Sequence, residues 1–354
     1  MSVRLGCGDY RVAVLTRGDL TRPVVEVPWN TIEWGRVLDE TSEATVTAGG
    51  GCCDALLAAA VRPWSHQLAI YRGADGAVPR RVWSGPLVAL RDGDALTFVA
   101  RDLSAWFDRR RVHTDQIHVA ADLATIFEAI WDDALDPDPI EGFTLDIAPA
   151  GVDGDREVLA DQYRMAGDEL RELGRTGLDW TVIDRVHHVG PEEIDTPPIA
   201  SLIDEHLAEP PEATIDGAGQ ANDWVVTGSG GGAEGAEVFG TASATPGPEG
   251  LLEAVASEPA ILDDTSALAA ADNRLARSAA PLRFVRDLQL LDTAPVPIDR
   301  LVPGARVRVA LENRCIPVRA VLRLTGVRVS VRPTDRGVQE TVTLDVEPLG
   351  AVAS

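Results

Sequence analysis

The run in this sequence that most resembles a ligand-binding motif is the glycine-rich stretch 228–235, GSGGGAEG. Glycine-rich loops bind phosphates when they end in Gly-Lys-Ser/Thr, or when they open a helix directly after a strand. This stretch has neither feature, and all 32 basic residues of the chain are arginine. A P-loop and lysine Schiff-base chemistry are therefore excluded, and the stretch is interpreted as a loop between strands.

His187 and His188 are the adjacent pair that could bind a metal ion. They lie in a predicted strand, where successive side chains point to opposite faces, so they cannot both bind one ion without distortion. The other histidines are scattered and form no HExxH motif. The four cysteines also lack zinc spacing and are interpreted as small buried thiols in a reducing compartment: Cys7, Cys52, Cys53 and Cys315.

The 56 acidic residues are so many that accidental carboxylate pairs are expected, so they give little support for a glycosidase. The sequence also has no GxSxG elbow and no cysteine in a catalytic motif. We therefore expect that the protein is not an enzyme and that it uses no cofactor and no metal.

The charge of the chain is unevenly distributed. Residues 1–111 contain 14 arginines and 13 acidic residues, residues 112–272 contain 5 and 35, and residues 273–354 contain 13 and 8. The middle block, at net −30, repels the phosphates of nucleic acid and disfavours ordinary DNA binding. Solubility is the simplest role for such a block.

The stretch Val27 to Gly49 carries the clearest structural pattern. Apolar residues alternate with polar ones on both sides of the break DETSE, which predicts a β-hairpin with one buried face. Arg36 lies on the apolar side, between Trp34 and Leu38. We expect its side chain either to cross Trp34 and reach solvent or to meet a buried carboxylate.

Further short strands with Asp-Gly turns predict a small antiparallel barrel or sandwich over residues 1–111. A short alanine-rich helix is expected from Asp54 to Val61. The segment DLSAWFDRRR, residues 102–111, is expected to close the domain through Trp106 and Phe107, with its three arginines facing outward.

Residues 112–190 predict an α+β domain. Asp122 is expected to open a helix, because a single apolar stripe follows it: Leu123, Ile126, Phe127, Ile130 and Trp131. A second helix is expected near 168–173 with Gly174 as its C-cap, followed by two strands within 178–190. Residues 191–211 are acidic and proline-rich and are interpreted as a linker.

Residues 212–354 are predicted to be mainly β. A helix is expected over 264–278, with Leu268, Ala271 and Leu275 in register, and the strands after it alternate arginine with valine and leucine. The predicted fold class is mostly β with an α+β insertion. No apolar run approaches the roughly 18 residues of a membrane span, and the N-terminus lacks a signal-peptide pattern. We therefore expect a soluble protein made in a cytoplasm.

The order of motifs along the chain resembles the minor tail, or baseplate hub, proteins of phages that infect high-GC Gram-positive bacteria. The resemblance rests on WGRVLDETSEATVTA, the Cys52-Cys53 pair, PWSHQLAIYR, VWSGPLVAL, ALTFVARDLSAWFDRR, DELRELGRTGLDWTV, LVPGARVRV and VTLDVEPLG. The motif residues taken as its structural signature are Trp34, Arg36, Trp64, Trp83, Gly85, Asp102, Trp106, Gly177, Trp180, Pro303 and Gly304.

This resemblance implies two tail-tube-like β-barrel domains, with the acidic α+β domain inserted between or beneath them. The first barrel is placed at 1–111, the inserted domain at 112–190, the linker at 191–211 and the second barrel at 212–354. The implied protein is a homotrimeric hub at the virion tail tip, made in the host cytoplasm. Its implied partners are distal tail or tail-tube proteins, the tape-measure protein and other tail-tip or receptor-binding proteins.

DNA is expected to pass such a hub without specific binding, and we hypothesise that the acidic block lines the passage. Two other functions remain open at this stage. One is a distal tail ring protein of related barrel fold. The other is a receptor- or carbohydrate-binding module, for which the eight tryptophans could supply an aromatic platform, although most lie at strand-like apolar positions.

Overall fold

The computed structural model describes residues 8–49, 61–73, 78–191, 197–228, 238–258, 261, 264–279, 282–312, 315–335 and 337–348. The chain forms two compact units, each assembled from non-contiguous segments. Unit 1 comprises Met1–Pro210, Asp287–Val307 and Arg323–Val346. Unit 2 comprises Pro211–Arg286, Arg308–Leu322 and Glu347–Ser354. The four ranges inferred from the sequence remain predictions.

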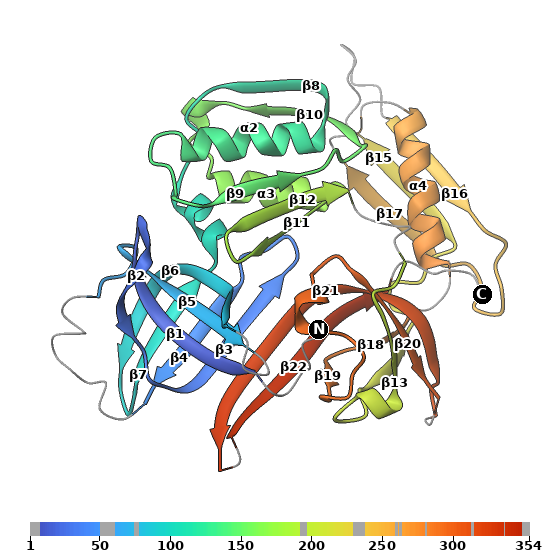
Figure 1. The fold of residues 1–354 in the computed structure, drawn as a ribbon. Helices are drawn as coiled ribbons and strands as arrows, with labels where there is room; N and C mark the ends of the chain where they lie inside the picture. The colour runs from blue at the N-terminus through green and yellow to red at the C-terminus, as the bar shows by residue number, and fades with distance from the viewer. Residues whose placement is uncertain are drawn as a thin grey trace. The chain divides into compact units, whose positions relative to one another are not determined.

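Unit 1 is built on a large sheet that contains strands from both halves of the chain (Figure 1). Its strands run in the order β21-β3-β4-β7-β6-β5-β1-β2, with β22 paired to β21 and β19 paired to β22. Their bounds are β1 (Asp9–Thr16), β2 (Asp19–Glu26), β3 (Trp29–Val37), β4 (Glu43–Ala48), β5 (His66–Gly73), β6 (Arg80–Asp92), β7 (Leu96–Arg101), β19 (Leu288–Leu290), β21 (Val318–Thr334) and β22 (Gly337–Pro348). The mostly β fold class is confirmed.

The hairpin predicted at 27–49 is confirmed as the antiparallel pair β3 and β4. Its apolar face is buried, as the alternation requires, at Ile32, Trp34, Ala44, Val46 and Ala48. On its other side β3 pairs with β21, so that Trp34 lies opposite Val329. This pairing joins residues almost 300 positions apart (Figure 1).

The α+β module follows η1 (Leu103–Arg109), a 3₁₀ helix. It contains the ribbon of β8 (Gln116–Asp122) and β10 (Asp153–Val158), and the sheet β11-β12-β9 (Leu178–Ile183, Val186–Pro191, Thr144–Ile147). Its helices are α2 (Leu123–Leu135), η2 (Ala160–Gln162) and α3 (Ala166–Arg175). Figure 1 shows α2 between the ribbon and the sheet.

The helix predicted after Asp122 is confirmed. The Asp122 carboxylate accepts from Ala124 N at 2.8 Å and caps the helix. The predicted stripe faces the core of the module, although Trp131 is only partly buried. Trp106 and Phe107 of η1 belong to that same core. The segment expected to close the first domain therefore also anchors the inserted module.

Two local predictions need correction. Helix α3 ends at Arg175 with Thr176 as its C-cap, not at Gly174, and Gly177 adopts the positive φ of 111°. The segment 191–211, whose interpretation as a linker remains a prediction, contains β13 (Ala200–Ile203) and η3 (Asp204–His206). Arg110 does not face fully outward, because its Nη1 donates to Ala134 O at 3.1 Å.

Unit 2 contains a sheet of β16 (Val238–Ser243), β15 (Asp223–Gly228) and β17 (Glu253–Glu258), packed against α4 (Asp264–Ser278). The bounds predicted for α4 are confirmed, but its buried face is made by Ala267 and Ala271 while Leu268 is 47% exposed. The helix approaches so closely that a Cβ on Gly240 would lie 2.2 Å from the carbonyl carbon of Ala267.

Strand β17, which pairs parallel to β15, was not predicted from the sequence. The remaining elements are the pair β14 (Ala213–Asp216) and β18 (Leu282–Val285), η4 (Ile298–Arg300) and β20 (Arg306–Leu311). Residues 54–60 of the helix predicted at 54–61 and residues 229–235 of the glycine-rich stretch lie outside the described residues, and Val61 is not helical. None of the described helices has the length and hydropathy needed to span a membrane.

A buried ion pair connects β22 to the N-terminal strands of unit 1. Arg72 on β5 donates from Nε to Glu340 Oε2 at 2.7 Å and from Nη2 to Oε1 at 3.0 Å. The Tyr10 hydroxyl on β1 donates to Glu340 Oε2 at 2.8 Å. The side chains of Arg72 and Glu340 are only 3% and 0% exposed. Burial, then the charge of Glu340, raises the pKa of Tyr10 well above its usual value.

We predict that Glu340→Gln lowers the free energy of unfolding by about 3–5 kcal/mol, because it leaves the Arg72 guanidinium buried beside a neutral group. Urea denaturation measures the change. The matched control is Glu26→Gln, which removes the carboxylate of an exposed Arg11–Glu26 pair in the same sheet. It is expected to cost less than about 1 kcal/mol. Equal losses in the two variants would contradict the role assigned to Glu340.

Candidate functional site

The signature residues Trp83, Gly85 and Asp102 meet around one buried carboxylate. Asp102 accepts from Ser42 N at 2.6 Å, Ser104 N at 2.9 Å and Ser104 Oγ at 2.6 Å. Trp83 Nε1 donates to Ser42 Oγ at 3.2 Å. Burial raises the pKa of the Asp102 carboxyl, while these hydrogen bonds act in the opposite direction. This cluster fixes the start of η1, from which the chain leaves the sheet.

Gly85 on β6 is required by a close backbone contact in this cluster. A Cβ at this position would lie 1.7 Å from Arg101 O, which no side chain can tolerate. Trp106 of η1, which lies shortly after Asp102, packs edge-to-face against Trp64, with ring centroids 5.0 Å apart. Arg17 lies over the Trp106 ring at 4.5 Å. These contacts hold in place the segment that connects the sheet to the module.

Arg36 differs from both sequence-based expectations, because it neither reaches solvent nor pairs with a buried carboxylate. It is 3% exposed, lies over the Trp34 ring at 5.4 Å, and donates from Nη1 to Leu301 O at 3.2 Å and Ile298 O at 3.5 Å. The carbonyls of the first residue and the C-cap of η4 therefore replace the carboxylate as its acceptors. Burial lowers the pKa of Arg36 to about 10.

The turn of the β3–β4 hairpin holds the α+β module through hydrogen bonds that each involve at least one main-chain atom. Asp39, at φ 56°, donates from its backbone N to Trp180 O at 2.8 Å, and its Oδ1 accepts from Trp180 N at 2.8 Å. Thr181 Oγ1 donates to Val37 O at 2.9 Å. Asp39 lies in the polar break of the predicted hairpin, but its contact with Trp180 was not predicted from the sequence.

The turn between β11 and β12 holds the module at a second place. Asp184, at φ 54°, accepts at Oδ1 from Arg81 Nε at 2.6 Å and from Ser84 Oγ at 2.9 Å. Arg185 donates from Nη1 to Gln67 Oε1 at 2.7 Å and also to Glu141 O. Burial, and then the nearby Arg81, lower the pKa of Arg185 to about 10. The module is therefore tied to β5 and β6 as well as to β3.

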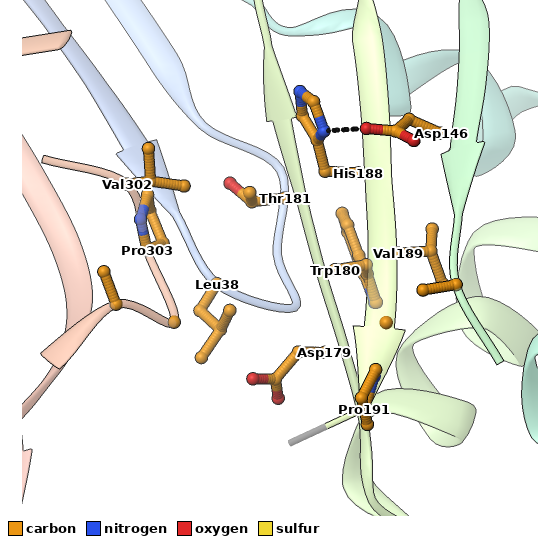
Figure 2. Close-up of a pocket in the computed structure, with 14 residues that line it drawn as sticks. Leu38, Asp146, Asp179, Trp180, Thr181, His188, Val189, Pro191, Val302 and Pro303 are labelled. Carbon is orange, nitrogen blue, oxygen red and sulfur yellow. Dashed lines mark hydrogen bonds and ion pairs between the residues drawn. The ribbon is translucent and has the colours of Figure 1, made fainter. Parts of the chain in front are cut away.

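A hollow of about 300 Å³ lies where the hairpin end, the module and the 302–305 loop meet. Figure 2 shows Leu38, Val302 and Pro303 on one side of it and Trp180, Val189 and Pro191 on the other. Signature residue Gly304 takes φ 89° here and donates from its N to Leu324 O at 2.7 Å. The structure thus brings Trp180, Pro303 and Gly304 together, while Gly177 precedes β11 outside the hollow.

The polar groups of this hollow are already engaged within the chain. His188 Nδ1 lies 2.9 Å from Asp146 Oδ2, and Asp179 pairs with Arg323 (Figure 2 shows the first of these contacts). The Thr181 hydroxyl donates to the backbone carbonyl of Val37. In the described ranges no group of three or more His, Cys, Asp or Glu residues could hold a metal ion. The arrangement suits the positioning of elements.

His187 is buried in an aromatic cluster in the module core. Its ring centroid lies 5.1 Å from Phe127, 5.8 Å from Phe143 and 5.0 Å from Trp180, and it stacks on Phe143 with an interplanar angle of 14°. Neither ring nitrogen has a hydrogen-bond partner in the described part of the chain. Burial lowers the pKa of His187 to about 3. His188 points to the opposite face, as the strand pattern predicted.

The prediction of a buried thiol is wrong for one of the four cysteines. Cys315 is exposed. The other three cysteines, Cys7, Cys52 and Cys53, lie outside the described residues.

Comparison with known proteins identifies the fold. No family model and no curated protein matches the sequence. Among solved structures, a tail protein from Neisseria meningitidis MC58 has a TM-score of 0.64 and 15% identity, covering 95% of this chain and 96% of its own. The 43 kDa tail protein of prophage MuSo2 from Shewanella oneidensis has a TM-score of 0.61, 11% identity and coverages of 94% and 98%.

The prophage tail protein gp18 from Listeria monocytogenes EGD-e likewise has a TM-score of 0.61 and 11% identity, covering 97% of this chain and 96% of its own. These structures match both units together with the inserted module, because each covers nearly the whole chain. The chain therefore has the fold of phage tail proteins, which confirms the resemblance inferred from its motifs at the level of the fold.

We predict that His187→Phe weakens the pH dependence of stability. In the wild type the unfolded His187 binds a proton near pH 6.5 while the folded one does not until about pH 3. Its contribution to stability is therefore complete above pH 6.5 and is lost as the pH falls toward 3, at up to about 1.4 kcal/mol per pH unit. Urea denaturation between pH 7 and 5 should show a shallower slope of stability against pH in the variant. The control is Val189→Ala in the same core, which removes no titratable group and should lower stability while retaining the wild-type slope.

We also predict that Gly85→Ala destabilises the protein by about 3 kcal/mol or prevents folding, because its Cβ would collide with Arg101 O. Thermal unfolding and soluble yield measure the effect. Gly93→Ala in the turn after β6 is the matched control, since a Cβ there meets no atom within 4 Å. A Gly85→Ala protein as stable as Gly93→Ala would be inconsistent with the contact described.

Proposed function

We propose that this chain is a structural protein of a phage tail tip, in which three copies form a hub ring that joins the tail tube to the tip. The observation that carries the proposal is the likeness to the Neisseria meningitidis tail protein over 95% of this chain and 96% of that one. A match of this extent includes the sheet, the inserted module and unit 2.

The internal contacts of unit 1 support the role of a rigid scaffold. A hub has to keep its shape while neighbouring proteins attach and while the tail ejects its contents. The sheet is joined across its sequence-distant strands by the buried Arg72–Glu340 pair, and the module is held by Asp39 and Asp184. Fixed polar contacts of this kind suit a scaffold better than a site that must open for a substrate.

The charge distribution supports a passage that does not retain DNA. The middle block, residues 112–272, contains 35 acidic residues and 5 arginines. A surface of this charge repels phosphates, so DNA would pass without specific binding. In this proposal the partners are the tail-tube or distal tail proteins, the tape-measure protein and other tail-tip or receptor-binding proteins. The role is structural, needs no cofactor and is carried out in the virion.

Negative-stain electron microscopy of the purified protein at high concentration tests the proposal. We expect class averages with a three-fold ring and an open centre. A six-fold ring would instead favour a distal tail ring protein. Compact single subunits at every concentration would contradict self-assembly into a hub and would favour a binding module.

A further inference from the structure

The protein repeatedly places an arginine over an aromatic ring and beside a carboxylate. Arg17 lies over the Trp106 ring at 4.5 Å and donates to Asp138 Oδ2 at 2.5 Å. The same arrangement recurs at Arg274 with Trp224 and Glu258, and at Arg11 with Tyr71 and Glu26. Guanidinium groups favour this environment because the ring face and the carboxylate both attract a weakly hydrated cation.

A hollow at the C-terminal end of α2 has the ring and the carboxylates without the arginine. Its volume is about 510 Å³, and its apolar lining consists of Trp131, Leu135, Pro139, Ile140 and Phe143. The rings of Trp131 and Phe143 lie 5.5 Å apart at an angle of 48°. Figure 1 shows α2, whose last turn carries the hollow, within the inserted module.

The acidic residues lining this hollow differ in their hydrogen bonding. Asp133 accepts from His113 N and from Thr114 Oγ1, each at 2.6 Å. Asp132 and Asp136 are exposed, and neither carboxylate has a hydrogen bond or ion pair with another residue that the structure describes. Asp138, which follows in the same loop, is paired with Arg17 and Arg110.

The position of Asp132 and Asp136 on the helix is electrostatically unfavourable. The C-terminal end of a helix carries partial negative charge and favours cations. The last turn of α2 has no basic residue, and Asp136 is its C-cap. An external cation seated between these carboxylates would remove the repulsion, and the Trp131 ring provides the apolar surface on which a guanidinium stacks.

We infer that this hollow binds an arginine side chain from a second copy of the chain. The inference rests on the proposed ring and assigns one of its contacts. Charge complementarity favours a second copy, since residues 112–272 hold 35 acidic residues and residues 273–354 hold 13 arginines. Exposed arginines without a side-chain partner among the described residues are present in that last segment: Arg300, Arg308 and Arg332. A contact between unlike surfaces of successive copies generates a ring when the rotation from copy to copy closes.

Sedimentation equilibrium of the Asp132→Asn, Asp136→Asn double variant tests the inference. We expect its association constant to fall about tenfold or more relative to the wild type, because charge-assisted contacts to one guanidinium are lost. The thermal midpoint of the dissociated variant should stay equal or rise, since two acidic groups leave the negative end of α2. A purely structural role for these carboxylates would not raise stability while weakening association.

The matched control is the Glu128→Gln, Glu157→Gln double variant, which removes two exposed charges from the same module outside the hollow. It should associate like the wild type. If the Asp132→Asn, Asp136→Asn variant associates like the wild type, the inference is overturned and the ring proposal still stands. This holds even if that variant no longer binds another tail protein. A wild type that stays monomeric would overturn the inference and also count against the ring.

Discussion

The buried contact between Arg72, Glu340 and Tyr10 is the constraint on which the arrangement of unit 1 depends most directly. A guanidinium and a carboxylate removed from water are costly unless each has the other and further hydrogen bonds. Here both bidentate bonds and the tyrosine hydroxyl are present. Because Arg72 and Glu340 are 268 positions apart, this condition is met only when β22 lies in one register beside the N-terminal strands.

Two aspartates with left-handed backbone conformation tie the inserted module to that sheet. Asp39 and Asp184 have φ values of 56° and 54°, and each uses its carboxylate to accept from the opposite element. Aspartate tolerates this conformation better than most residues because its short side chain can form local hydrogen bonds. Asp184 therefore gives part of the acidity of residues 112–272 a structural role, while carboxylates such as Asp132 and Asp136 remain available to the proposed external cation.

The core of the module shows how apolar packing can outweigh an unsatisfied polar group. His187 occupies a position among Phe127, Phe143 and Trp180 with no partner for either nitrogen. An unpaired imidazole costs free energy, but ring contacts on several sides stabilise its neutral form. The tail-protein fold accommodates this cost within a module that the proposed hub needs to keep rigid.

The sequence alone determined the elements whose residue pattern follows directly from burial on one face. The period-two pattern at 27–49, the cap and stripe of α2 and the bounds of α4 are all local signals of burial on one face. The motif order also indicated the tail-protein fold. In contrast, the carbonyl partners of Arg36, the strand β17 and the end of α3 at Arg175 followed from tertiary packing.

The contacts within the candidate site could not be predicted from the sequence for the same reason. Trp83, Gly85 and Asp102 were identified individually, but only the folded chain shows that Ser42 joins two of them and that Arg101 O restricts the third. A residue pattern records whether a side chain is buried, not which distant group it meets. Partner identity is decided by strand register and helix docking, since these bring together residues that no sequence spacing relates.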